Sequence, residues 1–85
     1  MAYLFDAGAG IFFPLAPHHT FGRLASAVDT QVDKPYISKL HAAIEWTGRT
    51  WRIKNLGLNG TRINGNALGQ GDQVDLCVGD EIHFV

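Results

Sequence analysis

Residues 42–54 read AAIEWTGRTWRIK, and this stretch decides the fold. Apolar residues occupy every second position on both sides of the polar segment Thr47-Gly48-Arg49. The alternating apolar residues are Ala42, Ile44, Trp46, Trp51 and Ile53. A period of two is typical of a strand with one buried face, and turn residues between two such runs indicate a hairpin. The stretch therefore predicts two antiparallel strands, with both tryptophans on inward positions as core residues.

The same alternation returns toward the C-terminus. Val74 and Leu76 alternate with polar residues, and so do Ile82 and Phe84. The turn signals between these segments are Asn59-Gly60, Asn64-Gly65, Gly71-Asp72 and Gly79-Asp80. Short strands separated by frequent turns predict an all-β sandwich or barrel.

A short helix is the competing interpretation for the segment before Trp46. Ile37, Leu40, His41 and Ile44 also fit helical spacing, with Ser38 as an N-cap. Such a helix would be only about nine residues long, and isolated short helices are marginal. The hairpin uses some of the same residues, so the strand interpretation is favoured.

Composition excludes several classes of protein. The 85 residues allow one domain, 1–85, and their 46% hydrophobic content argues against a disordered chain. No apolar run approaches the roughly 18 residues of a membrane span, and no secretory signal is evident. The net charge of −1 argues against a nucleic-acid binder, and one cysteine excludes a disulfide framework. A free cysteine without a targeting signal suits the cytoplasm.

The charges are distributed unevenly along this nearly neutral chain. All 7 lysines and arginines lie between Arg23 and Arg62, whereas acidic residues gather near the C-terminus. Composition alone favours charges that merely decorate turns. Three loop segments suggest a more specific interpretation: Phe21-Gly22-Arg23, the SKLH segment at residues 38–41, and Asn59-Gly60-Thr61. A β-sandwich gathers its loops at its ends, so these segments can converge on one site.

The side chains in these loops suit an anion carried on a peptide. Arg23 offers a rigid fork of donors for phosphate oxygens, and Lys39 adds a mobile charge. Ser38 offers a hydroxyl and a free backbone N–H, and the Asn59 amide suits a peptide main chain. A phosphorylated side chain, with about −1.5 to −2 charges and three acceptor oxygens, matches this set of donors.

The order of these motifs resembles the forkhead-associated (FHA) domain, a phosphothreonine-recognition module. The motifs are G-R at Gly22-Arg23, S-x-x-H at residues 38–41 and N-G-T-x-x-N-G at residues 59–65, with supporting segments at 51–53 and 79–82. The resemblance implies a sandwich of two antiparallel sheets that binds phosphopeptides across loops at one end. It implies no catalysis, no cofactor and no metal. It also implies a phosphothreonine-containing partner in kinase signalling and an effector domain that acts with this module.

The resemblance also assigns roles to individual residues. Arg23, Ser38 and Lys39 would contact the phosphate, and Asn59 would hydrogen-bond the peptide main chain. Gly22 would allow the turn that presents Arg23. The residues that would structure the site are Gly22, His41, Gly60, Thr61, Asn64 and Gly65.

This chain departs from the family pattern at two places. Gly57 and Leu58 stand where the family often has serine or threonine, so one phosphate contact is missing. A hydrogen bond to a charged group contributes about 1.5–3 kcal/mol, so its loss weakens affinity tenfold or more. Arg62 either compensates by its charge or is a solvated loop residue. The family's final strand is also missing after Val85, so either the chain is cut short or the sheet ends early.

Three other interpretations remain open from the sequence. Gly57 and Leu58 motivate a phosphate-independent interaction or oligomerisation domain on the same scaffold. Ser38 and His41 suggest a small hydrolase, although no acid is placed to orient the histidine. A metal site would need to combine His18, His19, His41, His83 and Cys77. Adjacent histidines diverge on a strand, and Cys77 is expected to be inert on a strand beside Leu76 and Val78.

Overall fold

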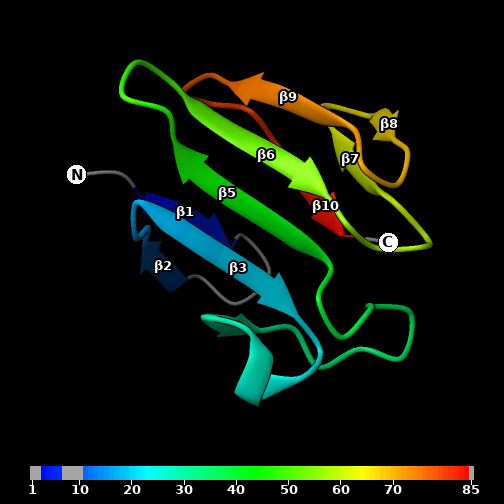
Figure 1. Ribbon diagram of the computed structural model, residues 1–85. Helices are drawn as coiled ribbons and strands as arrows, with labels where there is room; N and C mark the ends of the chain where they lie inside the picture. Colours follow the sequence, from blue (N-terminus) through cyan, green and yellow to red (C-terminus); the bar gives the residue numbers. More distant parts are fainter. Residues whose placement is uncertain (1–2, 7–10, 85) are drawn as a thin grey trace.

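A computed structural model describes residues 3–6 and 11–84, with side chains described for residues 14–84. The regular elements of the described chain are almost all β-strands (Figure 1), as predicted. The strands are β1 (Tyr3–Asp6), β2 (Ile11–Pro14), β3 (His18–Gly22), β4 (Thr30–Gln31), β5 (Ala42–Trp46), β6 (Trp51–Asn55), β7 (Thr61–Ile63), β8 (Asn66–Leu68), β9 (Gln73–Leu76) and β10 (Ile82–Phe84). A short 3-10 turn, η1, spans Ala25–Ala27.

The larger sheet has five strands in the order β4-β3-β5-β6-β9. The predicted hairpin lies at its centre, where Ile44 pairs with Ile53 and Trp46 with Trp51. The alternative helix is wrong, because β5 begins at Ala42 and the preceding residues form a loop. One pairing departs from the expected antiparallel pattern. The two-residue strand β4 runs parallel to β3, since the chain crosses through η1 before it pairs.

A second sheet, in the order β10-β7-β8, packs against the first. Its residues Ile63 and Phe84 join the core formed by Phe21, Ile44 and Ile53 on the larger sheet. The ring centroids of Phe21 and Phe84 lie 5.4 Å apart. β1 and β2 pair with each other as an antiparallel hairpin. The architecture is thus the predicted two-layer sandwich.

Two expectations about apolar residues need correction. Trp51 packs against the core, but 46% of Trp46 is exposed, because β5 ends at Trp46 and its ring lies at the margin of the core. Cys77 does not lie on a strand, since β9 ends at Leu76, and its side chain is exposed. The neighbouring Val78 is also fully exposed.

The strand directions bring three loops to one end of the larger sheet. β5 runs antiparallel to both β3 and β6. The end of β3 at Gly22, the start of β5 at Ala42 and the end of β6 at Asn55 therefore lie together, at the lower right of Figure 1. The loops attached there carry the motifs that the sequence singles out.

Candidate functional site

Hydrogen bonds join the three loops at this end of the sheet. The Arg23 N–H donates to the Ser38 carbonyl at 3.0 Å. The Leu58 N–H donates to the Ser38 hydroxyl oxygen at 3.3 Å. The Asn59 side-chain Nδ2 donates to the Tyr36 carbonyl at 2.9 Å. Residues from the loops after β3, before β5 and after β6 are thus held against one another.

His41 lies at the centre of this arrangement and is fully buried. Its Nδ1 accepts the Ser38 N–H at 3.1 Å, so the ring proton lies on Nε2 and is donated to the Gly60 carbonyl at 2.8 Å. Its backbone N–H donates to the Phe21 carbonyl at 2.8 Å. Its own carbonyl accepts the N–H of Gly57 at 2.9 Å. One residue therefore sets the positions of all three loops.

The hydroxyl of Ser38, rather than its amide, is the group available for a ligand. The Ser38 N–H was expected to be free, and this expectation is wrong, because the N–H is donated to His41 Nδ1. The hydroxyl oxygen accepts the Leu58 N–H, which leaves its hydrogen free to donate. The N–H of Lys39 has no acceptor in the part of the chain that the structure describes. A hydroxyl and an adjacent amide are thus presented side by side.

The guanidinium of Arg23 is fixed by its Nε. That atom donates to the Ile37 carbonyl at 3.1 Å, which leaves the two terminal nitrogens with their N–H groups available. No carboxylate pairs with Arg23 among the described side chains. Lys39 and Asn59 are both exposed at the same end. Because the Asn59 Nδ2 is engaged, its Oδ1 can accept an N–H from an extended peptide.

Two glycines allow the loops to approach this closely. A Cβ at Gly22 would collide with the Lys39 carbonyl, and a Cβ at Gly57 would collide with the His41 ring. Gly60 has a φ of +90°, which favours glycine. Gly57 stands out in the sequence only as a departure from the family pattern. In the structure it is the residue whose small size lets the third loop cross over His41.

Asn55 is a buried structural residue that was not predicted from the sequence. It is fully buried, and its Nδ2 donates to the carbonyls of Gly57 and Leu68 at 3.2 and 3.1 Å. Its Oδ1 accepts the Gly57 N–H and the Thr61 hydroxyl at 3.2 and 2.9 Å. Thr61 is also fully buried. Asn55 continues the inward alternation of Ile53, and a polar residue at such a position is a signal that could have identified it.

Three residues predicted around the site lie elsewhere. Arg62 lies on β7 between the buried Thr61 and Ile63, so alternation turns it outward instead of into a loop. Asn64 and Gly65 form the turn between β7 and β8, at the opposite end of β7 from Gly60. There the Asn64 Nδ2 donates to the Asp80 carboxylate at 3.0 Å.

The geometry does not support a hydrolytic pair. His41 Nδ1 accepts the backbone N–H of Ser38, and its Nε2 faces Gly60, so neither ring nitrogen faces the serine hydroxyl. Among the described residues, no three histidine, cysteine or acidic side chains are grouped as metal ligands. No helix in the described part of the chain is long and apolar enough to cross a membrane.

A scan against protein families matched the FHA domain over residues 19–85. Among solved structures, the chain is similar to Mycobacterium tuberculosis EmbR in complex with a low-affinity phosphopeptide, with 32% identity and a TM-score of 0.89. That match covers 96% of this chain and 21% of EmbR, so the chain spans about a fifth of that protein. The FHA domain of an Arabidopsis thaliana hypothetical protein is 28% identical with a TM-score of 0.82, over 96% of this chain and 72% of that chain.

A third structure, from a study of phosphothreonine-dependent FHA domain interactions, has 24% identity and a TM-score of 0.80. The match covers 96% of this chain and 83% of that chain, and at this identity it supports the fold alone. A comparison with curated protein sequences gave no significant match.

Proposed function

We propose that this chain, which belongs to the forkhead-associated domain family, binds phosphothreonine peptides through Arg23, Ser38, Lys39 and Asn59. The observation that carries the proposal is the convergence of these side chains on loops that His41 holds together. The module recognises a phosphorylated partner and leaves it chemically unchanged.

The phosphate is bound by donors that are already in place. Its three acceptor oxygens receive the terminal N–H groups of Arg23, the Ser38 hydroxyl and the Lys39 amide, and the Lys39 ammonium adds charge. Because the Arg23 Nε is bonded to Ile37 and the Ser38 oxygen to Leu58, little side-chain freedom is lost on binding. Asn59 Oδ1 accepts a main-chain N–H beside the phosphothreonine.

The comparisons support this proposal through the bound molecules of related proteins. EmbR was solved with a phosphopeptide, and the chain shares 32% of its residues over the matched region. In this interpretation the module is cytoplasmic, where serine/threonine kinases modify its partner. It acts together with an effector domain, because a recognition module carries no activity of its own.

A peptide-binding titration tests the proposal. One peptide is prepared with phosphothreonine, threonine, phosphoserine or glutamate at the same position, and we expect the phosphothreonine form to bind best. Arg23→Ala should weaken that binding tenfold or more, since about 1.5–3 kcal/mol is typical for a hydrogen bond to a charged group. Arg49→Ala is the matched control, because Arg49 lies on the exposed turn between β5 and β6, away from the loops.

The outcome that contradicts the proposal is equal binding of all four peptides, with no effect of Arg23→Ala. That result would instead favour a phosphate-independent interaction domain on the same scaffold. Thermal unfolding of each variant shows whether a loss of binding reflects the site or a loss of the fold.

A further inference from the structure

The outer face of the larger sheet carries two ordered rows of side chains. Cross-strand pairing aligns His18 with Glu45, Glu45 with Arg52, and Arg52 with Asp75. We call these four residues the charged row. The parallel mixed row, nearer the loops, consists of Thr20, Ala43, Lys54 and Gln73. Each row therefore crosses β3, β5, β6 and β9, and the signs in the charged row alternate from Glu45 to Asp75.

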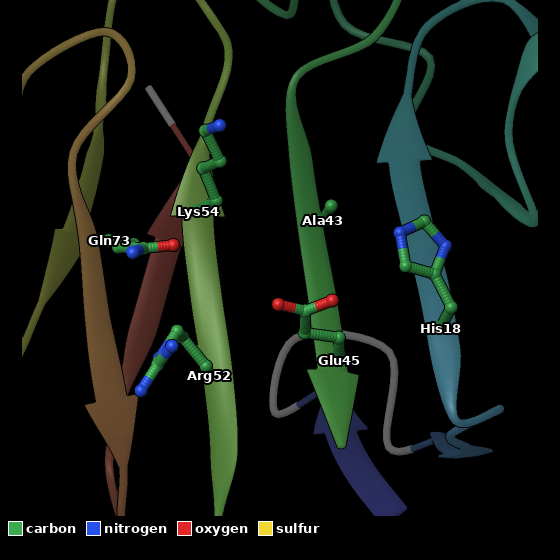
Figure 2. Close-up of a pocket in the computed structure, with 6 residues that line it drawn as sticks. All are labelled: His18, Ala43, Glu45, Arg52, Lys54 and Gln73. Carbon is green, nitrogen blue, oxygen red and sulfur yellow. The ribbon is translucent and has the colours of Figure 1, made fainter. Parts of the chain in front are cut away.

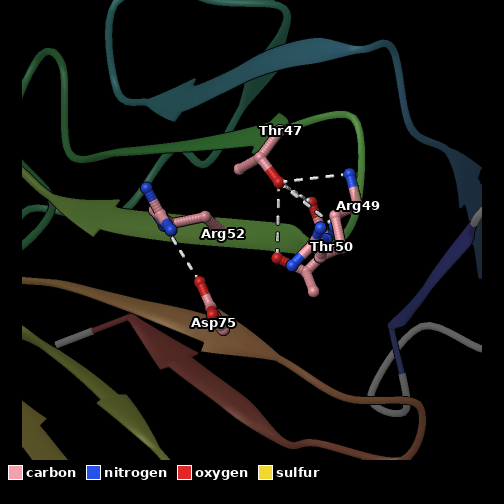
Figure 3. Close-up of polar contacts among 5 residues, drawn as sticks. All are labelled: Thr47, Arg49, Thr50, Arg52 and Asp75. Carbon is pink, nitrogen blue, oxygen red and sulfur yellow. Dashed lines mark hydrogen bonds and ion pairs between the residues drawn. The ribbon is translucent and has the colours of Figure 1, made fainter.

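The charges of these rows are only partly satisfied within the chain. Arg52 Nε and Asp75 Oδ1 form an ion pair at 2.9 Å (Figure 3). Glu45 and Lys54 are exposed and form no ion pair among the described side chains. Both line a hollow of about 230 Å³ on this face, of which Ala43 is the smallest lining residue (Figure 2). The face thus combines unpaired charges with an open space that a side chain can enter.

The order of the rows makes this face complementary to itself. Consider a two-fold axis that lies in the interface, runs parallel to the strands and passes between β5 and β6. This axis places the second copy's β6 opposite β5, and the second copy's β9 opposite β3. Glu45 then faces the second copy's Arg52, and His18 faces the second copy's Asp75. In the mixed row, the small Ala43 faces the second copy's Lys54, whose ammonium enters the hollow beside Glu45. Every charge on one copy meets an opposite charge, an open space or a neutral polar group on the other.

The charges also disfavour a second face-to-face arrangement. In that arrangement the two-fold axis lies in the interface and runs perpendicular to the strands. Each strand then faces the same strand of the second copy, which runs in the opposite direction. Arg52 would then face the second copy's Lys54, and two like charges would be brought together. Of these two arrangements, the one with the axis parallel to the strands joins charges of opposite sign.

We propose that the chain forms a face-to-face homodimer through this outer face, independently of the phosphopeptide loops. Four strands about 4.8 Å apart and about five residues long, at roughly 3.3 Å each, give a face of only about 300 Å². Stable interfaces bury about 800 Å² of each partner, so this dimer is weak and transient. Its axis leaves both loop ends on the same side. If the proposed function holds, the dimer can therefore engage a doubly phosphorylated partner by avidity.

Sedimentation equilibrium of the chain from micromolar to millimolar concentration tests the dimer. We expect the mean mass to rise toward twice that of the monomer, and to rise less in high salt. Glu45→Arg or Arg52→Glu alone places like charges together at both symmetric contacts, and should weaken dimerisation about tenfold or more. An equal mixture of these two variants restores opposite charges at both contacts, so the mixture should associate again.

Matched controls change the same charge away from this face. Glu81→Arg and Arg49→Glu are exposed positions outside the two rows and should leave dimerisation unchanged. The proposal is overturned if the unsubstituted chain stays monomeric at millimolar concentration, or if the mixture associates no more than each variant alone. The salt dependence of dimerisation of the unsubstituted chain tests, without any substitution, whether charges hold the dimer together. Dimerisation is measured without peptide, so its failure and a failure of phosphopeptide binding are distinguishable.

Discussion

The two ends of the β5–β6 pair hold their polar groups in different ways. At the loop end, His41 and Asn55 are fully buried, and every buried polar side-chain atom in the described part of the chain has a partner. At the hairpin end, the Thr47 hydroxyl also makes several hydrogen bonds, including 3.0 Å to the Thr50 carbonyl and 3.1 Å from the Thr50 N–H (Figure 3). The Thr47 side chain, however, is exposed.

Water accounts for the difference between these two ends. When an exposed hydrogen bond is lost, water replaces the partner, and the net loss of stability is small. When a buried partner is lost, the remaining group stays unpaired in a site that water does not reach. The loop end therefore has one well-defined geometry, as a ligand site requires, whereas the hairpin end tolerates substitution.

Replacement of Asn55 by alanine should have the largest effect on stability. It removes the partners of the Gly57 and Leu68 carbonyls and of the Thr61 hydroxyl. Each buried unpaired group costs about 1–3 kcal/mol, so we expect a loss of about 3 kcal/mol or more in the free energy of unfolding. Urea unfolding measures it, and Thr47→Ala at the hairpin end should lose less than about 1 kcal/mol. Similar losses for the two variants would contradict the distinction between the ends.

Gly57→Ala should have the second-largest effect on stability. The added Cβ collides with the His41 ring, and overpacking of this kind costs about 1–3 kcal/mol. Since His41 positions Ser38, phosphopeptide affinity should fall as well. Gly48→Ala is the comparison at the hairpin end, where a Cβ meets open space and only the φ of +96° opposes it. We expect about 1 kcal/mol there and unchanged affinity. A Gly57→Ala variant with normal affinity would show that the ring moves aside without consequence.

Substitution of Leu58 can change the phosphopeptide affinity without breaking the hydrogen bonds that hold the three loops together. Its side chain is 81% exposed, while its backbone N–H is bonded to Ser38. Leu58→Ser should leave stability nearly unchanged and add a donor for the phosphate, which should raise phosphopeptide affinity about tenfold or more. Val78→Ser, at a fully exposed apolar position in another loop, should not change affinity. If both variants bind like the original chain, the residue 58 hydroxyl does not reach the ligand.

The fold was predictable from the sequence wherever apolar and polar residues alternate strongly. The apolar period of two in residues 42–54 fixed the central hairpin, and strand direction then placed the loops after β3 and β6 at one end. The two-residue β4 and the turn η1 lack any such period, so their crossover was not predicted.

The site was predicted less completely, because the spacing of motifs along the chain does not show which residues pack against one another in the folded protein. Arg23, Ser38 and Asn59 were proposed as ligand-binding residues from their donors and their order in the sequence. The packing of Gly57 on His41 depends on two segments that meet only in the folded chain. Arg62 was expected in a loop, but it lies on β7. Its side chain points outward because β7 begins at Thr61, and the sequence does not show where that strand begins.

The smallest effect should come from two carboxylates in loops, the exposed Asp29 and the half-buried Asp80. Hydrogen bonds from the Thr20 backbone and hydroxyl lower the pKa of Asp29, and those from the Cys77 N–H and Asn64 lower the pKa of Asp80. A lowered folded-state pKa stabilises the fold above the pKa of the unfolded chain. That contribution is lost as the pH falls through the folded-state pKa, below about pH 4. Unfolding measured from pH 6 to pH 2 should therefore show a shallower acid loss in the D29N/D80N double variant.

Asp33→Asn is the control, since that exposed carboxylate accepts no hydrogen bond from the described residues. Its acid profile should follow that of the original chain. The Asn55 amide does not titrate, so its hydrogen bonds to Gly57, Leu68 and Thr61 do not depend on these two carboxylates. Acid should therefore loosen the β3–β4 connection and the β9–β10 turn without breaking the hydrogen bonds of Asn55. Hydrogen exchange at pH 3 tests this order, and amides near Asn55 that exchange as early as those near Asp80 would contradict it.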